Sequence, residues 1–359
     1  MSIDQEGRLI CKSGDILGQK YRVIKDCSFG TFSNVYTCSD TKNQHQVVVK
    51  CYRSQNYFSQ SAEREIKIMR VLNKLDLDQS LFVPYLGSFY YHGHLCIVLE
   101  KYGQSLYEAF SARKFTPLNS MAIRSILLKC GNALKILHHS GIIHTDLKLE
   151  NILLPNNFNP DRDFDISPPS SPPSSCGSGS EEIGFGIDLN ESQPLKTSID
   201  ARLIDFGSFA KGSQWHRSLA TTVEYRAPEI LMGLQWGTEC DIWSLGCILV
   251  ELALGKIKFA ANDDIEHLFL IQHMISPLTQ SMCDRTTNEK LQKSLCGYLI
   301  NPSTFDNETK ERLLKMPTLS ELLSFDDDLN DLAQKMLNPD PSQRISIDEV
   351  LEHRFFKCY

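Results

Sequence analysis

Residues 144–151 read His144-Thr145-Asp146-Leu147-Lys148-Leu149-Glu150-Asn151, an octapeptide that lies between two apolar runs. It brings a carboxylate at Asp146, an ammonium at Lys148 and an amide at Asn151 close together in the sequence. Phosphoryl transfer needs a carboxylate that orients an attacking hydroxyl, a cation on the transferred phosphate and an oxygen ligand for magnesium. The three side chains fit those roles in order. For the octapeptide alone, a charged surface loop is the alternative interpretation.

Four further motifs occur along the chain in the order that this chemistry requires. Lys50 ends the run Val47-Val48-Val49-Lys50, and Glu65 lies on a helical pattern. Asp205-Phe206-Gly207 and Ala227-Pro228-Glu229 come later. Because five motifs in this order are not a coincidence, the surface-loop interpretation is set aside. Together they resemble a eukaryotic protein kinase over essentially the whole chain.

The resemblance implies an α+β, bilobal kinase domain over residues 21–356. A small β-rich N-lobe would cover residues 21–102, and a larger, mainly helical C-lobe would cover residues 103–356. The hydrophobic periodicity agrees, because it alternates in short runs before Leu99 and becomes helical after Leu106. We expect strands at Tyr21–Lys25, Asn34–Cys38, Gln46–Tyr52, Tyr85–Tyr91 and Leu95–Leu99, and helices at Ala62–Leu72 and Met121–His138.

Two segments fall outside this pattern. Residues 1–20 are polar, and we expect a loosely attached lead-in. Residues 155–198 interrupt the C-lobe, and their centre is so rich in Ser, Pro and Gly that it has almost nothing to bury. We therefore expect a disordered insert. Replacing Asp161 to Glu191 by a short Gly/Ser linker should then leave the catalytic rate and the melting temperature nearly unchanged.

Composition restricts the class of protein. The net charge of −7 gives no support for direct nucleic-acid binding and favours basic partners. The twelve cysteines form no Cys-x-x-Cys pair, and Cys96, Cys130 and Cys247 lie in apolar runs, which indicates reduced core cysteines. No signal peptide is visible in residues 1–20. The longest apolar stretch is too short to span a membrane. We expect an intracellular monomer.

The kinase resemblance assigns the phosphate and metal sites. The phosphate loop aligns with the stretch that contains Cys27, Ser28 and Gly30, where the middle glycine remains but serines replace the outer two. A plain hairpin turn is the alternative for that stretch alone. Lys50 would bind the α- and β-phosphates of ATP and form a lobe-bridging ion pair with Glu65. Asn151 and Asp205 would hold Mg²⁺.

The resemblance also assigns the adenine pocket. Leu99 falls at the gatekeeper position, and the backbones of Glu100 and Tyr102 would bond the adenine edge. Leu153 would form the pocket floor. Two valines would complete the lining, Val35 and Val48, and Val48 stands where the family usually has alanine.

Four positions match residues that support the catalytic site in kinases. Thr222 matches the residue that hydrogen-bonds the catalytic aspartate and lysine. Glu229 and Arg344 match a buried ion pair, and Asp241 matches the carboxylate that anchors the catalytic loop from below.

Several features resemble the LAMMER (Clk) kinases, a dual-specificity family of the CMGC group. Thr145 replaces the usual arginine and gives His-Thr-Asp-Leu-Lys, which is characteristic of that family. Three further segments look alike: His92–Val98, Leu203–Ser208 and Cys240–Leu249. The family's name motif is only half present in Glu266–His273, and Val223 replaces an arginine in the substrate-facing loop. Both departures lie where substrate is selected.

The resemblance implies an ATP- and Mg²⁺-dependent kinase acting on Ser/Thr, with tyrosine autophosphorylation. It also implies arginine/serine-rich splicing proteins as substrates and the nucleus as compartment, with the cytoplasm as alternative. The cluster Asp326, Asp327, Asp328 and Asp331 would attract basic substrates, or else it caps a helix or is merely solvated. A pseudokinase scaffold is the competing function, supported only by the altered glycine loop and Val48. A small-molecule kinase is disfavoured by Thr222 and Ala227-Pro228-Glu229.

Overall fold

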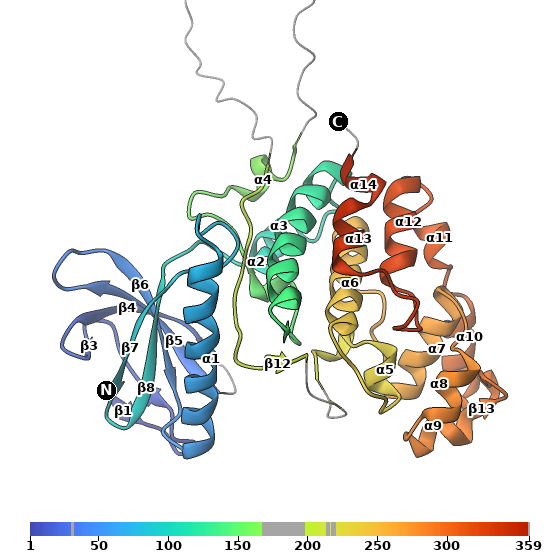
Figure 1. Cartoon of the computed structure of the whole chain (residues 1–359), viewed down its shortest axis with the longest axis horizontal. Helices are drawn as coiled ribbons and strands as arrows, with labels where there is room; N and C mark the ends of the chain where they lie inside the picture. Colours follow the sequence, from blue (N-terminus) through green and yellow to red (C-terminus); the bar gives the residue numbers. More distant parts are fainter. Residues whose placement is uncertain (30–31, 167–197, 213–215, 217–219, 358–359) are drawn as a thin grey trace, which may run out of the picture.

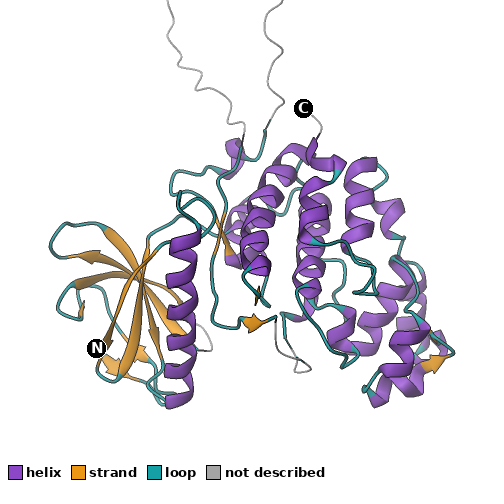
Figure 2. Cartoon of the chain, viewed as in Figure 1, coloured by secondary structure: helices purple, strands orange, loops and turns teal. Residues whose placement is uncertain are grey.

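The computed structural model describes residues 1–29, 32–166, 198–212, 216 and 220–357, and leaves the side chains of residues 26–29 and Asn56 undescribed. The chain forms a small lobe built on a curved β-sheet and a larger lobe built of helices (Figures 1 and 2). One long helix of the small lobe, α1, faces the larger lobe (Figure 1). The predicted α+β, bilobal architecture is confirmed.

The small lobe contains a six-stranded antiparallel sheet in the order β3-β4-β5-β6-β8-β7. Alternation decides which face each side chain takes, so that Val47, Val49 and Cys51 are buried while Val48 and Lys50 face the other way. All five predicted strands are present. The strands of this sheet are β3 (Ile16–Leu17), β4 (Tyr21–Phe29), β5 (Ser33–Asp40), β6 (Gln46–Tyr52), β7 (Tyr85–Tyr91) and β8 (His94–Glu100).

Helix α1 (Asn56–Leu75) is longer at both ends than the sequence pattern predicts. Ala62, Ile66, Met69 and Leu72 recur at helical spacing and are buried. They fix the rotation of the helix and turn Glu65 into the interior, where it is only 2% exposed.

The prediction of a loosely attached lead-in is wrong. Residues 1–20 form the hairpin β1 (Ser2–Ile3) and β2 (Leu9–Ile10) and add β3 to the sheet. Leu9 and Leu17 are buried in the small-lobe core, and the Tyr36 hydroxyl donates to the Leu9 carbonyl at 2.7 Å. The segment therefore packs on the sheet of the small lobe. Its few apolar residues are buried against side chains that lie farther along the chain, such as Tyr36.

The larger lobe is organised around α6, whose residues Cys240–Ala253 are buried all round. A helix with no polar face must be enclosed by others, and α3 packs against α6. The bounds of α3 differ by one residue at each end from the predicted helix Met121–His138. No helix in the described ranges is long and apolar enough to cross a bilayer. The α-helices of this lobe are α2 (Leu106–Ala112), α3 (Ser120–His139), α4 (Pro160–Asp163), α5 (Pro228–Leu231), α6 (Glu239–Leu254), α7 (Asp264–Met274), α8 (Gln280–Arg285), α9 (Glu289–Ser294), α10 (Asn307–Leu314), α11 (Leu319–Leu322), α12 (Asp327–Met336), α13 (Ile347–Glu352) and α14 (Arg354–Lys357).

Short paired strands and 3₁₀ turns connect the helices of the larger lobe. β9 pairs with β12, β10 with β11 and β13 with β14. These elements are β9 (Ile142–Ile143), η1 (Leu149–Asn151), β10 (Ile152–Leu153), β11 (Arg202–Leu203), β12 (Ala210–Lys211), η2 (Val223–Tyr225), β13 (Leu295–Cys296), β14 (Leu299–Ile300) and η3 (Pro302–Thr304).

The predicted start of the disordered insert is also wrong. Residues 155–166 contain α4 and pack on the larger lobe, because Phe158, Phe164 and Ile166 are buried. The Phe158 and Phe164 rings meet edge to face, with centroids 4.9 Å apart. The centre of the predicted insert, residues 167–197, lies outside the described residues.

Candidate active site

The start of the octapeptide is anchored from below by Asp241 of α6. Its two carboxylate oxygens accept the backbone N–H groups of His144 at 2.8 Å and Thr145 at 2.9 Å. His138 of α3 contacts the same carboxylate at 3.0 Å. Because Asp241 is fully buried on the central helix, it fixes the loop against the core of the larger lobe. The predicted anchoring role of Asp241 is confirmed.

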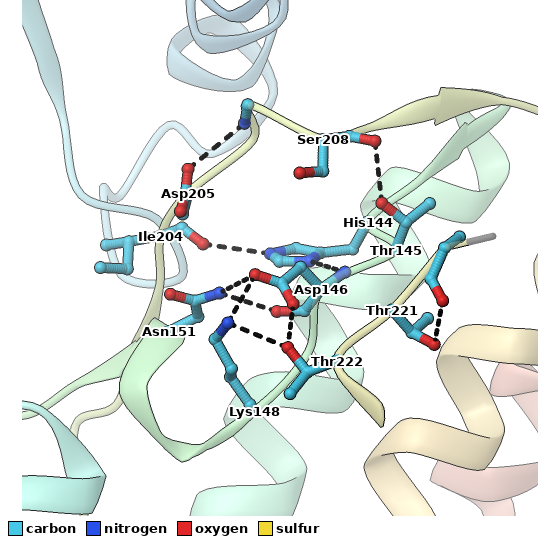
Figure 3. Close-up of polar contacts among 12 residues, drawn as sticks. His144, Thr145, Asp146, Lys148, Asn151, Ile204, Asp205, Ser208, Thr221 and Thr222 are labelled. Atoms are coloured by element: carbon cyan, nitrogen blue, oxygen red, sulfur yellow. Dashed lines mark hydrogen bonds and ion pairs between the residues drawn. The ribbon is translucent and has the colours of Figure 1, made fainter. Parts of the chain in front are cut away.

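Asp146 is the centre of a compact polar cluster (Figure 3). Lys148 Nζ lies 2.8 Å from its Oδ2, and Thr222 Oγ1 donates to its Oδ1 at 2.7 Å. Lys148 Nζ also donates to Thr222 Oγ1 at 3.0 Å. The Asn151 amide donates to the Asp146 carbonyl at 2.7 Å and to Oδ2 at 3.1 Å. The structure thus brings together the three octapeptide side chains and Thr222, which follows them by more than seventy residues.

A second cluster lies around Lys50. Its Nζ contacts both oxygens of Glu65, at 3.0 and 3.1 Å, and Oδ1 of Asp205 at 2.8 Å. Tyr52 also donates its hydroxyl to Glu65. Lys50 and Glu65 both belong to the small lobe, so the prediction that their pair bridges the lobes is wrong. Within this cluster, the contact that crosses between the lobes is Lys50–Asp205.

The charges of this cluster shift the pKa values of Lys50 and Asp205. The Lys50 ammonium is the main reason that the pKa of Asp205 falls to about 2, against the opposing effect of burial. Burial alone would lower the pKa of Lys50, but the carboxylates of Asp205 and Glu65 outweigh it and hold the pKa well above its ordinary value. Lys50 and Asp205 are therefore both charged at neutral pH.

Backbone geometry turns Asp205 toward Lys50. Asp205 has φ +68°, in the left-handed region that a non-glycine residue seldom adopts. The neighbouring Phe206 is buried, with its ring 5.3 Å from that of His144 and 5.7 Å from that of Phe82. His144 Nε2 also contacts the Ile204 carbonyl at 3.1 Å (Figure 3). Packing on both sides thus stabilises the unusual backbone and fixes the direction of the carboxylate.

The predicted adenine-lining residues share one face of the small-lobe sheet. In the strand register, Val35 lies opposite Lys50, and Val48 lies opposite Leu99. Since Val48 and Lys50 are two residues apart on one strand, these four side chains point the same way. All four are half-buried, as is Leu153 on β10 of the larger lobe. The arrangement gives an apolar roof that ends at the Lys50 ammonium.

The remaining predicted nucleotide residues are only partly described. Cys27 and Ser28 lie on β4, whose pairing with β5 continues to the end of the strand. Their side chains, and Gly30, lie outside the described residues. The Glu100 amide donates to the Pro84 carbonyl at 3.0 Å, and the Tyr102 hydroxyl donates to Asp200 at 2.7 Å.

Comparison with known proteins agrees with this geometry. The protein kinase domain family matches residues 21–356. Dual specificity protein kinase CLK4 of Homo sapiens is 32% identical over 98% of this chain and 69% of its own length. Serine/threonine-protein kinase AFC1 of Arabidopsis thaliana is also 32% identical, over 98% of this chain and 74% of its own length. The chain belongs to the CLK-type (LAMMER) protein kinases.

A solved kinase structure supports the same assignment at the level of the fold. The crystal structure of a kinase domain superimposes with a TM-score of 0.81 at 27% sequence identity, over 98% of this chain and the whole of that one. The kinase also has the predicted buried ion pair, in which Arg344 donates to both oxygens of Glu229 at 2.8 and 2.9 Å.

Sequence reasoning missed one polar residue beside the catalytic loop, Glu251 of α6. It accepts the Tyr225 hydroxyl at 2.6 Å and is only 4% exposed. Burial raises the pKa of Glu251 to about 7, the charges of Glu150 and Glu224 add to the rise, and the Tyr225 hydrogen bond opposes it. The available signal was a lone glutamate inside an apolar helical run.

Three carboxylates of the Asp326–Asp331 cluster form hydrogen bonds or ion pairs within the larger lobe. Asp326 caps α12 by accepting the N–H groups of Asp328 and Leu329, at 3.1 and 3.0 Å. Asp328 pairs with Arg354 at 2.7 Å, and Asp331 pairs with Lys335 at 2.9 Å and with His353 at 3.0 Å. The helix-capping alternative is therefore confirmed for Asp326, and the paired carboxylates are poor candidates for attracting substrate.

Proposed function

We propose that this kinase transfers the γ-phosphate of ATP to serine or threonine hydroxyls flanked by arginines in its protein substrates. The observation that carries the transfer step is the Asp146 carboxylate, which is oriented by Lys148, Asn151 and Thr222 at 2.7–3.1 Å. A carboxylate held in this way can orient an acceptor hydroxyl and take its proton.

Each residue of the cluster has a distinct role in this proposal. Asp146 accepts the proton of the substrate hydroxyl. Lys148 balances the charge of the γ-phosphate. Thr222 hydrogen-bonds both Lys148 and Asp146 and so fixes their relative positions. Lys50 binds the α- and β-phosphates, and its pair with Glu65 fixes the ammonium at the end of the apolar roof.

Asn151 and Asp205 are the proposed holders of Mg²⁺. The Asn151 amide nitrogen donates to Asp146, so its Oδ1 is the atom that can face a cation (Figure 3). Asp205 remains ionised because its pKa is about 2. Two oxygen ligands from the protein, completed by phosphate oxygens and water, suit Mg²⁺. When bound, the ion neutralises charge that develops on the phosphates.

The adenine would lie against Val35, Val48 and Leu99 from above and Leu153 from below. Glu100 and Tyr102 would contact its edge through their backbones, and Cys27, Ser28 and Gly30 would lie over the phosphates. Since Lys50, Glu65, Asp146 and Asp205 are all present and in contact within their clusters, a scaffold without chemistry is not favoured.

The proposed preference for arginine rests on carboxylates beside the catalytic loop. Glu150 is exposed on η1, between the catalytic lysine and Asn151, and Glu224 follows Thr222 on η2. Both lie close enough to Glu251 that their charges raise its pKa. A substrate guanidinium beside the acceptor serine would relieve this repulsion between like charges.

Resemblance to the relatives extends the proposal. It adds tyrosine autophosphorylation, arginine/serine-rich splicing proteins as substrates and action in the nucleus. A monomeric enzyme without direct nucleic-acid binding is part of the same proposal.

The proposal is tested with purified protein, ATP, Mg²⁺ and a peptide with one serine between arginines. We expect a phosphopeptide that is identified by mass, and no product from the Ser→Ala peptide. Lys50→Met and Asp205→Asn should each nearly abolish product and keep the fold, as judged by circular dichroism. Product formation by both variants at the wild-type rate would refute the assigned roles.

A further inference from the structure

A groove of about 610 Å³ lies between the end of α1 in the small lobe and α3 in the larger lobe. Its walls include Leu75, Leu81, Leu128 and Ile136. Leu75 is 46% exposed and Leu128 is 41% exposed, although both are apolar. We call it the α1–α3 groove. It shares no lining residue with the pocket around Asp146, so it is a separate surface.

The rim of the α1–α3 groove is basic. Lys129, Lys135 and His139 line it, and no carboxylate is among its described lining residues. The carboxylate partners of these residues lie outside the groove lining: Lys129 pairs with Asp200 at 3.0 Å, and Lys135 and His139 both contact Asp348 at 2.8 Å. Because the Lys129 and Lys135 side chains are still 28% and 45% exposed, their ammonium groups can also contact an acidic, apolar ligand in the groove.

A segment of the same chain has this chemistry. Residues 181–191 read Glu-Glu-Ile-Gly-Phe-Gly-Ile-Asp-Leu-Asn-Glu, with four acidic residues and no basic one. Ile183, Phe185, Ile187 and Leu189 occupy alternate positions. In an extended chain, alternate side chains point to one face, so the segment can present an apolar side flanked by carboxylates.

The chain re-enters the described structure at this groove. Ser198 is one of the groove's lining residues, and the Ile199 amide donates to Ser125 Oγ on α3 at 2.6 Å. Only residues 192–197 separate Glu191 from Ser198, a span of up to about 20 Å when extended. A tether this short gives an effective concentration in the millimolar range, so even weak contacts suffice.

We propose that residues 181–191 dock, extended, in the α1–α3 groove of their own chain. The alternating apolar side chains cover Leu75 and Leu128, and the acidic residues face the basic rim. Since Leu75 ends the helix that carries Glu65, the docked segment ties α1 to α3 across the two lobes. This function is separate from phosphate transfer, and it stands or falls independently of the proposed substrate.

Hydrogen exchange of the full chain tests the docking. Amides of residues 181–191 should exchange at least tenfold more slowly than those of residues 168–178, and Leu75→Asp or Leu128→Asp should abolish the difference. Leu314→Asp is the matched control, because Leu314 also ends its helix and is also 46% exposed. Phe185→Asp lies in the segment and leaves the groove residues unchanged. It should also abolish the difference in exchange rate.

A peptide experiment distinguishes the occupants. A labelled peptide of residues 179–193 should bind a chain that lacks residues 181–191, at least tenfold more tightly than it binds the same chain with Leu128→Asp. Its affinity should fall as salt rises. Equal exchange across residues 168–191 in the wild type would overturn the proposal. Protection that depends on protein concentration would also overturn it, because a second copy would then fill the groove.

Discussion

At the scale of single residues, the titration of Glu251 should affect both the stability of the fold and the proposed preference for arginine. Its carboxyl group is buried beside Tyr225, and its pKa is about 7 because of burial and the neighbouring charges of Glu150 and Glu224. A folded-state pKa above the ordinary value of 4.5 means that the protonated form stabilises the fold. This stability is fully present below about pH 4.5 and is lost as the pH rises through about 7.

Glu251→Gln should remove this pH dependence, because a neutral amide still accepts the Tyr225 hydroxyl. We expect the difference in melting temperature, variant minus wild type, to be several degrees larger at pH 8 than at pH 5.5. This shift corresponds to about 1–3 kcal/mol of unfolding free energy in a protein of this size. Thermal unfolding at the two pH values measures it. A constant difference between variant and wild type would show that Glu251 does not titrate in this range.

The same carboxylate should make the arginine preference depend on pH. Above about pH 7 Glu251 is ionised and can attract a substrate guanidinium, whereas below it the group is neutral. We expect the ratio of kcat/KM for an Arg-Ser peptide to that for its Arg→Gln counterpart to rise from pH 6 to pH 8, and to fall with salt. In Glu251→Gln the ratio should be flat with pH. A rise of equal size in both proteins would place the arginine site elsewhere.

At the scale of elements, contacts made by Thr145 tie the catalytic loop to the segment that follows Asp205. Its hydroxyl donates to the Ser208 carbonyl at 2.8 Å (Figure 3). In kinases with arginine at this position, a phosphate on the activation segment must neutralise the cation. Thr145 has no charge, so its contact with Ser208 does not need a phosphate.

Enzyme treated with phosphatase should therefore keep most of its activity, and alanine at Ser213 and Ser218, which lie outside the described residues, should be tolerated. Thr145→Val keeps the shape of the side chain and removes its hydrogen bond, so kcat should fall severalfold with no new need for phosphate. Initial rates before and after treatment measure this. A collapse of activity after dephosphorylation would point to a phosphate site in another basic pocket, with Arg64 and Lys211 as its candidates.

The order of residues 155–166 leads to a prediction about stability. Phe164 is fully buried against Phe158, so Phe164→Ala should cost about 3–5 kcal/mol of unfolding free energy. Deletion of residues 167–180, which are polar and proline-rich, should leave both melting temperature and kcat unchanged. Urea unfolding of the two variants checks the contrast. Equal stability of Phe164→Ala and wild type would mean that the segment does not contribute to the core.

Strands and helices with a regular apolar period could be predicted from the sequence, as α3 and the five central strands show. The catalytic residues could be predicted because their spacing is local within each motif. Three features could not. Residues 1–20 and 155–166 are held by a few apolar side chains at irregular spacing, and Tyr52 reaches Glu65 from a different element. Such contacts depend on partners far along the chain, which no local period encodes.

At the scale of the whole molecule, two charge clusters lie near the lobe boundary: the Lys50 cluster joins both lobes, and the Asp146 cluster belongs to the larger lobe. Asp205 belongs to the larger lobe and contacts Lys50 of the small lobe, while Asp146 is held from below by contacts that reach back to Asp241 on α6. The proposed catalysis therefore needs both lobes to be correctly placed, although the proposed proton transfer depends on the Asp146 carboxylate alone.

Single-turnover phosphate transfer by Asp146→Asn tests most directly whether Asp146 is the catalytic base. The amide keeps the size of the carboxylate but cannot take a proton, so the rate should fall about 10²–10⁴-fold. ATP affinity and melting temperature should stay close to those of the wild type, because Lys50, Glu65 and Asp205 are untouched. Transfer by Asp146→Asn at the wild-type rate would contradict the central claim that Asp146 is the catalytic base.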